Sequence, residues 1–202
     1  MTAEEQALEA LGTARLGQRL RELRRERGVT LRELADRLGI SVSAVSQIER
    51  GVLQPSVNRL LALVSALGVP LARVFDESAR DGAAGASATG YVLARSGDVG
   101  TVELEDGVLY RRLSPGETRG VDFFESTYPP GSHAGADHAL ITHVGYEVGT
   151  VERGELTILF EHEEVVLGSG DSITFPCDVP HRIENRGART AVATWLIVHD
   201  AR

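Results

Sequence analysis

The spacing of hydrophobic residues changes once along the chain. Up to Phe75 the apolar residues recur at the three-to-four-residue spacing of helices, as Leu16, Leu20 and Leu23 illustrate. From Tyr91 onward the spacing is close to two, and glycine, proline and aspartate separate short apolar stretches. The pattern therefore predicts a helical part followed by a part dominated by strands.

Capping residues divide the helical part into separate elements. Thr30 and Glu33 form a capping box at the start of "LRELADRL", and Gly39 provides the left-handed residue that ends this helix. Ser41 can cap the next helix, "VSAVSQIER". A fourth helix follows Pro55, and "VPLARVF" closes the group. Together these elements predict a five-helix bundle.

Composition places a boundary between the two parts. The stretch "SARDGAAGASATG" is small, polar and without a hydrophobic period, so residues 78–90 are predicted to be a flexible linker. We expect one domain over residues 11–77 and a second over residues 91–200. Residues 1–10 are expected to form a frayed or weakly helical arm.

Charge is distributed unequally between the two parts. Leu11–Phe75 contains eleven arginines against five acidic residues, a net charge of +6. Ala79–Arg202 contains ten arginines against nineteen acidic residues, a net charge of −9. This asymmetry favours binding of a polyanion by the N-terminal part.

The sequence predicts a cytoplasmic protein. No apolar run is long enough to span a bilayer, and the acidic start "MTAEEQALEA" is unlike a secretory signal. Cys177 is the single cysteine, so no internal disulfide can form, which fits a reducing compartment. We expect no membrane partner.

The second and third predicted helices have the packing pattern of a helix-turn-helix. Val45 and Ile48 face inward, and the small Ala35 lets the third helix approach closely. The stretch "LRELADRLGISVSAVSQIERG" resembles the lambda-repressor-like (XRE-type) helix-turn-helix family, over roughly Leu16–Phe75. The resemblance implies that the third helix enters the major groove of double-stranded DNA, where a glutamine can read adenine.

The resemblance also supplies candidate DNA contacts. Base contacts are expected from Val42, Ser43, Ser46 and Gln47, and phosphate contacts from Arg50, Ser56, Asn58 and Arg59. The alternative is a helical bundle that docks on protein, with its arginines merely solvated.

Two motifs in the strand-rich part have matched spacing. The first contains His143, Glu147 and Gly154, with Ile141 where a further histidine is usual. The second is Gly170, Pro176, His181 and Asn185, with Asp178 in place of a glycine. Both resemble the cupin family over Tyr91–Val198, which implies a jelly-roll barrel, also called a double-stranded β-helix.

The motif residues define a candidate metal site. Residues 141 and 143 are expected to face the same side of a strand, with Glu147 following if the strand is unbroken and His181 on a facing strand. Two imidazoles and one carboxylate suit a divalent ion with open coordination positions, with zinc, iron and nickel as candidates. The alternative is that the three side chains bind a polar ligand directly, without any cofactor.

Other residues of the strand-rich part indicate a function less specifically than the motif residues do. The candidate walls of an effector pocket are Arg111, Tyr128, Tyr146, Phe175 and Trp195, with Tyr110 beside them. The remaining histidines, His133, His138, His162 and His199, are expected at the surface. Cys177 is expected to be a small buried filler rather than a reactive thiol.

Together the two parts resemble bacterial transcription regulators with a cupin sensor. This resemblance implies a homodimer that binds an operator and a small-molecule effector, and that is not an enzyme. The alternative is a non-haem iron enzyme similar to hydroxypropylphosphonate epoxidase, which also joins a helix-turn-helix-like domain to a cupin. The small, polar outward face of the third helix favours the regulator.

Overall fold

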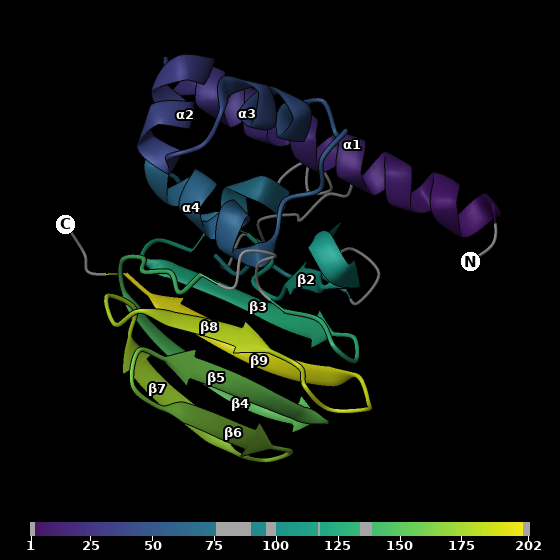
Figure 1. Cartoon of the computed structure of the whole chain (residues 1–202), viewed down its shortest axis with the longest axis vertical. Coiled ribbons are helices and arrows are strands. Elements are labelled where there is room, and N and C mark those ends of the chain that lie inside the picture. The colour runs from purple at the N-terminus through teal and green to yellow at the C-terminus, as the bar shows by residue number, and fades with distance from the viewer. Residues whose placement is uncertain (1–2, 76–89, 96–99, 117, 134–138, 200–202) are drawn as a thin grey trace.

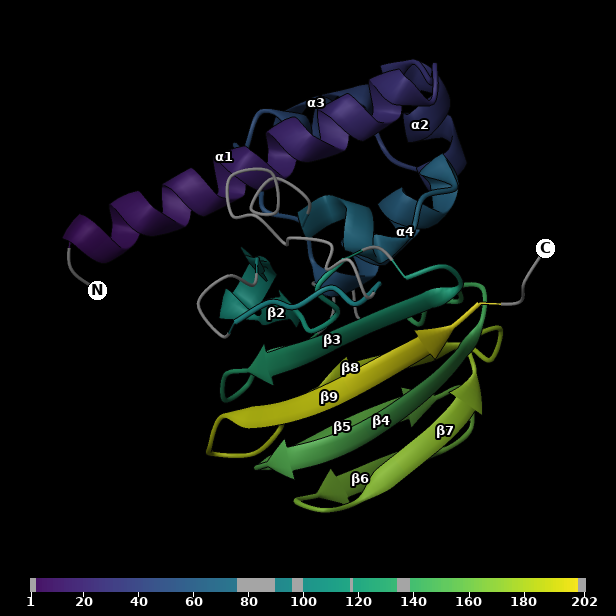
Figure 2. The same ribbon diagram turned by 180° about the vertical axis from the view of Figure 1, so that it is seen from behind.

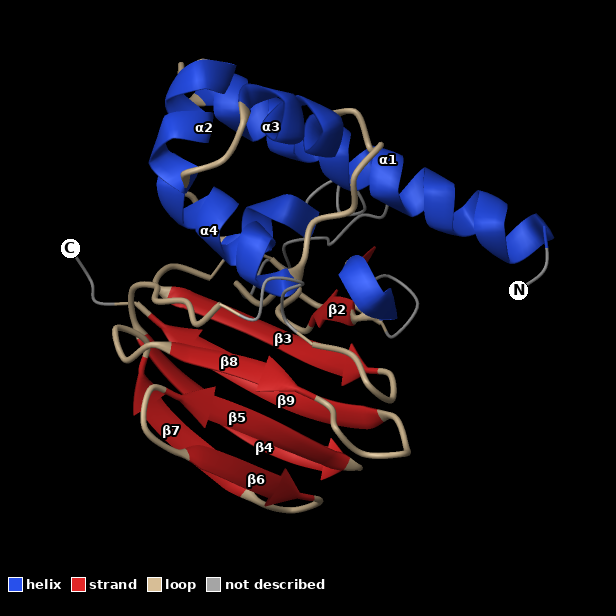
Figure 3. Ribbon diagram, in the orientation of Figure 1, coloured by secondary structure: helices blue, strands red, loops and turns tan. Residues whose placement is uncertain are grey.

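The protein consists of a helical domain placed against one side of a β-barrel (Figures 1 and 3). This arrangement comes from a computed structural model, which describes residues 3–75, 90–95, 100–116, 118–133 and 139–199, the side chains of residues 3–11 excepted. The order of elements, helices first and strands second, is the one that the change in hydrophobic period predicts. Most of the predicted linker, residues 78–89, lies outside the described residues.

The N-terminal domain contains four α-helices and one 3-10 helix. They are α1 (Ala3–Glu26), α2 (Leu31–Leu38), α3 (Val42–Glu49), α4 (Val57–Leu67) and η1 (Leu71–Phe75). The fifth element of the predicted bundle is therefore a short 3-10 turn, and the predicted frayed arm is helical from Ala3. Within the described part of the chain, no helix combines the length and apolar character that a membrane span requires.

The predicted caps form. Thr30 and Glu33 bond reciprocally at the start of α2, and the Ser41 hydroxyl accepts the amide of Ala44 at the start of α3. Gly39 lies between these helices in the left-handed conformation. The turn between α2 and α3 is thus fixed locally on both sides.

Helix α3 is held against α1 by a close approach and a buried ion pair. A Cβ on Gly17 of α1 would lie 2.4 Å from the carbonyl oxygen of Ile48, so only glycine allows this separation. Nearby, the Arg24 guanidinium binds Glu49 through two contacts, Nε to Oε1 at 2.5 Å and Nη2 to Oε2 at 2.9 Å, with both side chains buried. These contacts fix how α3 is presented to solvent.

The C-terminal domain is a barrel of two antiparallel sheets. The larger sheet has the order β1-β2-β3-β9-β4-β7 and the smaller one β6-β5-β8. The strands are β1 (Thr101–Glu103), β2 (Leu109–Arg112), β3 (Val121–Tyr128), β4 (Tyr146–Arg153), β5 (Glu155–Phe160), β6 (Glu164–Gly168), β7 (Ser172–Pro176), β8 (His181–Glu184) and β9 (Ala191–Val198), with a 3-10 turn η2 (Glu105–Gly107) before β2. Trp195, Tyr128, Leu156 and Ile158 fill the space between the sheets.

Hydrogen bonds join the two domains directly. Asp122 of β3 is buried and accepts the backbone amides of Leu71 and Ala72, its oxygens lying 3.2 and 2.9 Å from the nitrogens. Arg112 donates to the carbonyl of Ala72, and the amide of Glu105 donates to the carbonyl of Pro55. The helical domain is therefore bonded to the barrel as well as connected to it through the chain.

His199 completes this junction. Its Nε2 lies 2.9 Å from Oδ2 of Asp122, and the carbonyl of Val144 also hydrogen-bonds the ring. The hydrogen bond with Asp122 is the main cause that raises the pKa of His199 above 6.5. His199 is therefore a partly exposed residue, with 30% of its side chain accessible, that is also held by a distant strand, a contact that the sequence did not predict.

We expect the His199–Asp122 contact to stabilise the fold more at pH 6 than at pH 8. A histidine whose pKa is raised on folding contributes fully below its unfolded pKa of about 6.5, and the contribution is lost as the pH rises through the folded value. The free energy of urea unfolding, measured for wild type and His199→Gln, should therefore differ more at pH 6. His162→Gln, at a side chain that is 88% exposed, is the matched control. A difference for His199→Gln that stays constant or grows toward pH 8 contradicts this assignment.

Candidate functional sites

The solvent face of α3 carries the predicted base-reading residues. Val42 and Ser43 are exposed, and Ser46 and Gln47 are partly exposed on the same helix. Val45 and Ile48, which alternate with them, are buried in the helical core. The face is thus small and polar and leaves room for the edges of base pairs.

Gln47 is held in place on this face. Its Nε2 lies 3.3 Å from the Ser43 hydroxyl, one helical turn earlier. The amide keeps further donor and acceptor capacity, because a glutamine side chain has two N–H groups and a carbonyl oxygen.

The predicted phosphate contacts divide into two groups. Arg50 is exposed and Arg59 partly exposed, while Ser56 caps α4 by accepting the amide of Arg59. Asn58 does not fit the prediction: it is 7% exposed, and its Nδ2 donates to the carbonyl of Ala139 in the barrel domain at 3.0 Å. The side of α4 that carries Asn58 faces the barrel, so this residue joins the domains and is removed from the DNA-contact candidates.

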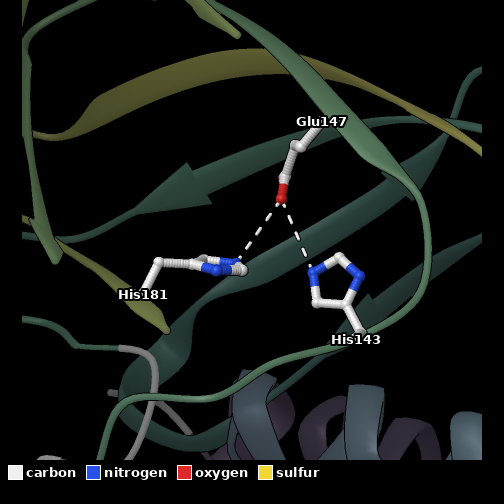
Figure 4. Close-up of side chains that lie close together, drawn as sticks. All are labelled: His143, Glu147 and His181. Atoms are coloured by element: carbon white, nitrogen blue, oxygen red, sulfur yellow. Dashed lines mark ion pairs between the residues drawn. The ribbon is translucent and has the colours of Figure 1, made fainter. Parts of the chain in front are cut away.

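The three predicted metal ligands converge in the barrel (Figure 4). Oε2 of Glu147 lies 3.6 Å from Nε2 of His143 and 3.7 Å from Nε2 of His181. One ligand atom from each residue lies within 4.8 Å of the others, and all three side chains are at most 7% exposed. The motif spacing thus brings together residues from β4, β8 and the segment before β4.

His143 reaches the site in a different way from the one predicted. β4 begins at Tyr146, so the strand does not run unbroken from His143 to Glu147. Gly145 makes the break at φ 117°, where a Cβ would lie 2.6 Å from the carbonyl oxygen of Val198. Ile141 pairs with His181 in an isolated bridge and is partly buried.

The hydrogen bonding of the two imidazoles and the protonation of His181 fit metal binding. Nδ1 of His181 lies 2.8 Å from the carbonyl oxygen of Val179, which makes Nδ1 the donor and leaves the lone pair of Nε2 facing Glu147. Burial lowers the pKa of His181, so the ring is neutral near pH 7. Nε2 of His143 is buried and has no hydrogen-bond partner among the described residues.

The spacing of these atoms also fits a metal ion. Two ligand atoms that are each about 2.1 Å from one ion lie roughly 3.0–3.4 Å apart, slightly less than the separations of 3.6 and 3.7 Å found here. Glu147 is thus close enough to both imidazoles for the three residues to supply two nitrogens and one oxygen to a single ion.

Some of the residues predicted to line the pocket point into the barrel, and others lie on its outer surface. Tyr128, Phe175 and Trp195 are buried inside, and the ring of Phe175 packs edge-on against that of His181 with centroids 4.8 Å apart. Arg111 instead pairs with Glu125 on the outer surface, and Tyr146 is 56% exposed. Because alternate residues of a strand face opposite sides, the inward position of Glu147 forces Tyr146 outward. Arg111 and Tyr146 are therefore removed from the pocket candidates.

Tyr110, Tyr128 and Cys177, all singled out from the sequence, are buried near the site. The hydroxyl oxygens of Tyr110 and Tyr128 lie 3.4 Å apart, and burial raises the pKa of both. Cys177 is fully buried, and burial raises its pKa to about 12, which agrees with a filler rather than a reactive thiol.

The two halves of the chain match two known families. Residues 20–74 match the helix-turn-helix family HTH_3, and residues 124–197 match the cupin domain family Cupin_2. The chain therefore combines an XRE-type helix-turn-helix domain with a cupin domain, as the sequence predicted.

Individual relatives agree with this organisation. The HTH-type transcriptional regulator PuuR from Escherichia coli (strain K12) is 29% identical over 172 residues, which cover 85% of this chain and 88% of PuuR. The crystal structure of an HTH_3 family transcriptional regulator from Vibrio cholerae has the same fold, with a TM-score of 0.70 at 20% identity over 96% of this chain and 99% of that one. Hydroxypropylphosphonic acid epoxidase from S. wedmorenis is more distant, with a TM-score of 0.45 and 18% identity over 92% of this chain and 97% of that one. The names of the regulators agree with the expectation that this chain is not an enzyme.

Proposed function

We propose that this protein is a DNA-binding transcription regulator that acts as a cytoplasmic homodimer on a palindromic operator. The observation that carries the proposal is the exposed, small and polar face of α3, with Gln47 at its centre. A helix of this kind fits the major groove, and a palindrome needs two such helices about one helical turn apart. The positive charge of the helical domain supports attraction to the phosphate backbone.

The Gln47→Ala variant is expected to lose sequence-specific binding. Loss of a bidentate base contact costs about 1–3 kcal/mol, so affinity for the operator should fall roughly 5- to 150-fold. Binding to random duplexes should change little, because phosphate contacts supply it. The measurement is fluorescence anisotropy on both duplexes, after selection of the operator from a random library with the wild-type protein.

Two further variants make this test specific. Gln18→Ala changes the same residue type on the exposed part of α1 and should leave both affinities unchanged. Arg59→Ala should weaken binding to both duplexes and flatten the dependence on salt by removing a phosphate contact. Equal losses on operator and random duplexes in Gln47→Ala would show that this residue does not read bases.

The barrel is proposed to bind a small effector that alters DNA affinity. His143, Glu147 and His181 would hold one zinc, iron or nickel ion with open coordination positions, and such an ion would attract an anionic group of the effector. Tyr128, Phe175 and Trp195 would line the space beside it.

The junction between the domains supports such coupling. His143 is followed by Val144, whose carbonyl bonds His199, and His199 bonds the Asp122 that holds the amides of η1. A movement of the segment around His143 would therefore be transmitted to the helical domain through three successive hydrogen-bonded contacts. Coupling energies between such sites are typically about 1–3 kcal/mol and reciprocal, so operator DNA should change effector affinity by the same factor.

The proposed domain boundaries assign DNA binding and effector sensing to separate parts of the chain. We propose residues 11–77 for DNA binding, residues 78–90 as the connection, and residues 91–200 for sensing. The helical period and net charge support the first range, and the motif spacing supports the last.

A second candidate function is a non-haem iron enzyme, which the arrangement of His143, Glu147 and His181 favours. Two histidines and one carboxylate with open positions are also the ligand set of iron oxygenases. Oxygen-dependent turnover by the iron-loaded protein would support the enzyme, and operator binding without turnover would support the regulator.

A further inference from the structure

The outer face of the larger sheet carries two rows of side chains that are apolar except for Thr174. The strand registers align Val121, Val198, Tyr146 and Pro176 in one row, and Phe123, Leu196, Val148 and Thr174 in the next. We call the six residues Val121, Phe123, Tyr146, Val148, Leu196 and Val198 the apolar sheet face. All six are at least partly exposed, although their inward-facing neighbours are buried.

The protein's own described elements leave this face open. In Figure 2, β3, β9, β4 and β7 lie side by side at the front of the barrel, and no helix crosses them. The helical domain bonds to β3 through Asp122, whose side chain is buried, and therefore not through the exposed residues of this face. A contiguous apolar patch of this kind on a folded protein usually marks a protein–protein contact.

We infer that the apolar sheet face is the contact through which two copies of this chain form a homodimer. The charge of the surface favours a second copy over an unrelated charged partner. Neither row contains a charged residue, whereas the barrel half of the chain has a net charge of −9. Two copies that both carry this negative charge can approach most easily where the contact itself is neutral.

The size of the face fits the centre of a two-fold interface. Two rows across four strands spaced about 4.8 Å apart cover roughly 19 by 14 Å. This is the scale of the desolvated centre of an interface that buries about 800 Å² per partner. The next row along the sheet, Glu125, Thr194, Thr150 and Ser172, is polar and would lie at the rim, where Arg111 already neutralises Glu125.

The inference names the contact surface of the proposed homodimer and does not depend on DNA binding. It predicts that Val148→Arg produces a monomer. Val148 is 41% exposed in the middle of the second row, so the arginine is tolerated in the single chain but becomes a buried, unpaired charge in the dimer. The dissociation constant of the dimer should rise by roughly 100-fold or more.

The measurement is sedimentation equilibrium of the full chain, with thermal unfolding to confirm that each variant is folded. Val166→Arg is the matched control, because Val166 is 52% exposed on β6 of the other sheet and this variant should remain dimeric. Tyr146→Glu, in the first row, should repeat the effect of Val148→Arg. A folded Val148→Arg protein that dimerises like wild type, a Val166→Arg protein that dissociates equally, or a wild type that stays monomeric would each overturn the inference.

Measurements of DNA binding distinguish a failure of this inference from a failure of the proposed function. The folded monomeric variant should still bind a single half-site and lose the added affinity for the full palindrome. A wild-type dimer that binds no DNA would contradict the regulator proposal and leave the dimer contact intact.

Discussion

The Glu49→Ala variant is expected to unfold far more easily than the wild type, with a free energy of unfolding about 3–5 kcal/mol lower. Glu49 is 7% exposed and accepts two hydrogen bonds from Arg24. Removing it leaves a buried guanidinium whose remaining hydrogen bond goes to the carbonyl of Val29. A charge buried without its counterion costs much more than an exposed ion pair contributes.

Urea unfolding followed by helical circular dichroism measures this difference. Glu22→Ala is the matched control, since Glu22 pairs with Arg19 but is 37% exposed, and its loss should cost less than about 1 kcal/mol. Replacing both partners, as in Arg24→Met with Glu49→Leu, should recover most of the stability because no buried charge remains. A loss in Glu49→Ala no larger than in Glu22→Ala would mean that the pair is not buried in solution.

This ion pair also bears on function. Glu49 is the last residue of α3, and Arg24 belongs to α1, so the pair fixes one end of the proposed reading helix to the rest of the domain. A destabilised variant should therefore lose affinity for operator and random DNA together, unlike Gln47→Ala.

The helical domain could be predicted closely from sequence because its signals are local. The reciprocal bonds of Thr30 and Glu33 and the left-handed Gly39 depend on residues within a few positions of each other. The fifth helix was predicted less well, since five residues cannot show whether a turn is α or 3-10.

The failures of prediction concern contacts between distant parts of the chain. Asn58 was expected to face solvent, yet it bonds Ala139, 81 residues later. His199 is partly exposed, as expected for a surface residue, but its hydrogen bond with Asp122, 77 residues earlier, was not predicted. A helical or strand period fixes which residues share a face, but it does not show which domain that face meets.

Some features of the candidate metal site could be predicted from the sequence and others could not. The spacing of the cupin motifs predicted that His143, Glu147 and His181 converge, and their ligand atoms do lie together. The path of the chain to His143 was not predictable, because the break at Gly145 depends on the nearby Val198 carbonyl in β9. By contrast, the outward position of Tyr146 follows from the strand period once Glu147 is placed inside.

Protein purified without an affinity tag is expected to hold close to one zinc, iron or nickel ion per chain, and His181→Ala is expected to hold essentially none. Two ligands cannot replace three, so the dissociation constant for zinc should rise by about 100-fold or more. The site is also partly organised for metal binding in the absence of an ion. The carbonyl of Val179 already orients the His181 ring, and Nε2 of His181 carries the lone pair that would bind the ion. Metal analysis by mass spectrometry and calorimetric titration with zinc give this result without relying on any activity.

The control for metal binding is His162→Ala, which removes a histidine that is 88% exposed and should leave the metal content unchanged. If neither wild type nor variant holds metal, and effector binding survives treatment with a chelator, the three side chains bind the effector directly as polar groups. If metal is present and supports oxygen-dependent turnover, the enzyme is favoured over the regulator. A third outcome is one ion per chain and no turnover in the wild type. If His181→Ala then loses both the ion and the effect of the effector on operator affinity, the ion is linked to regulation. That last outcome is the one expected, since hydrogen bonds lead from Val144, next to His143, through His199 and Asp122 to the helical domain.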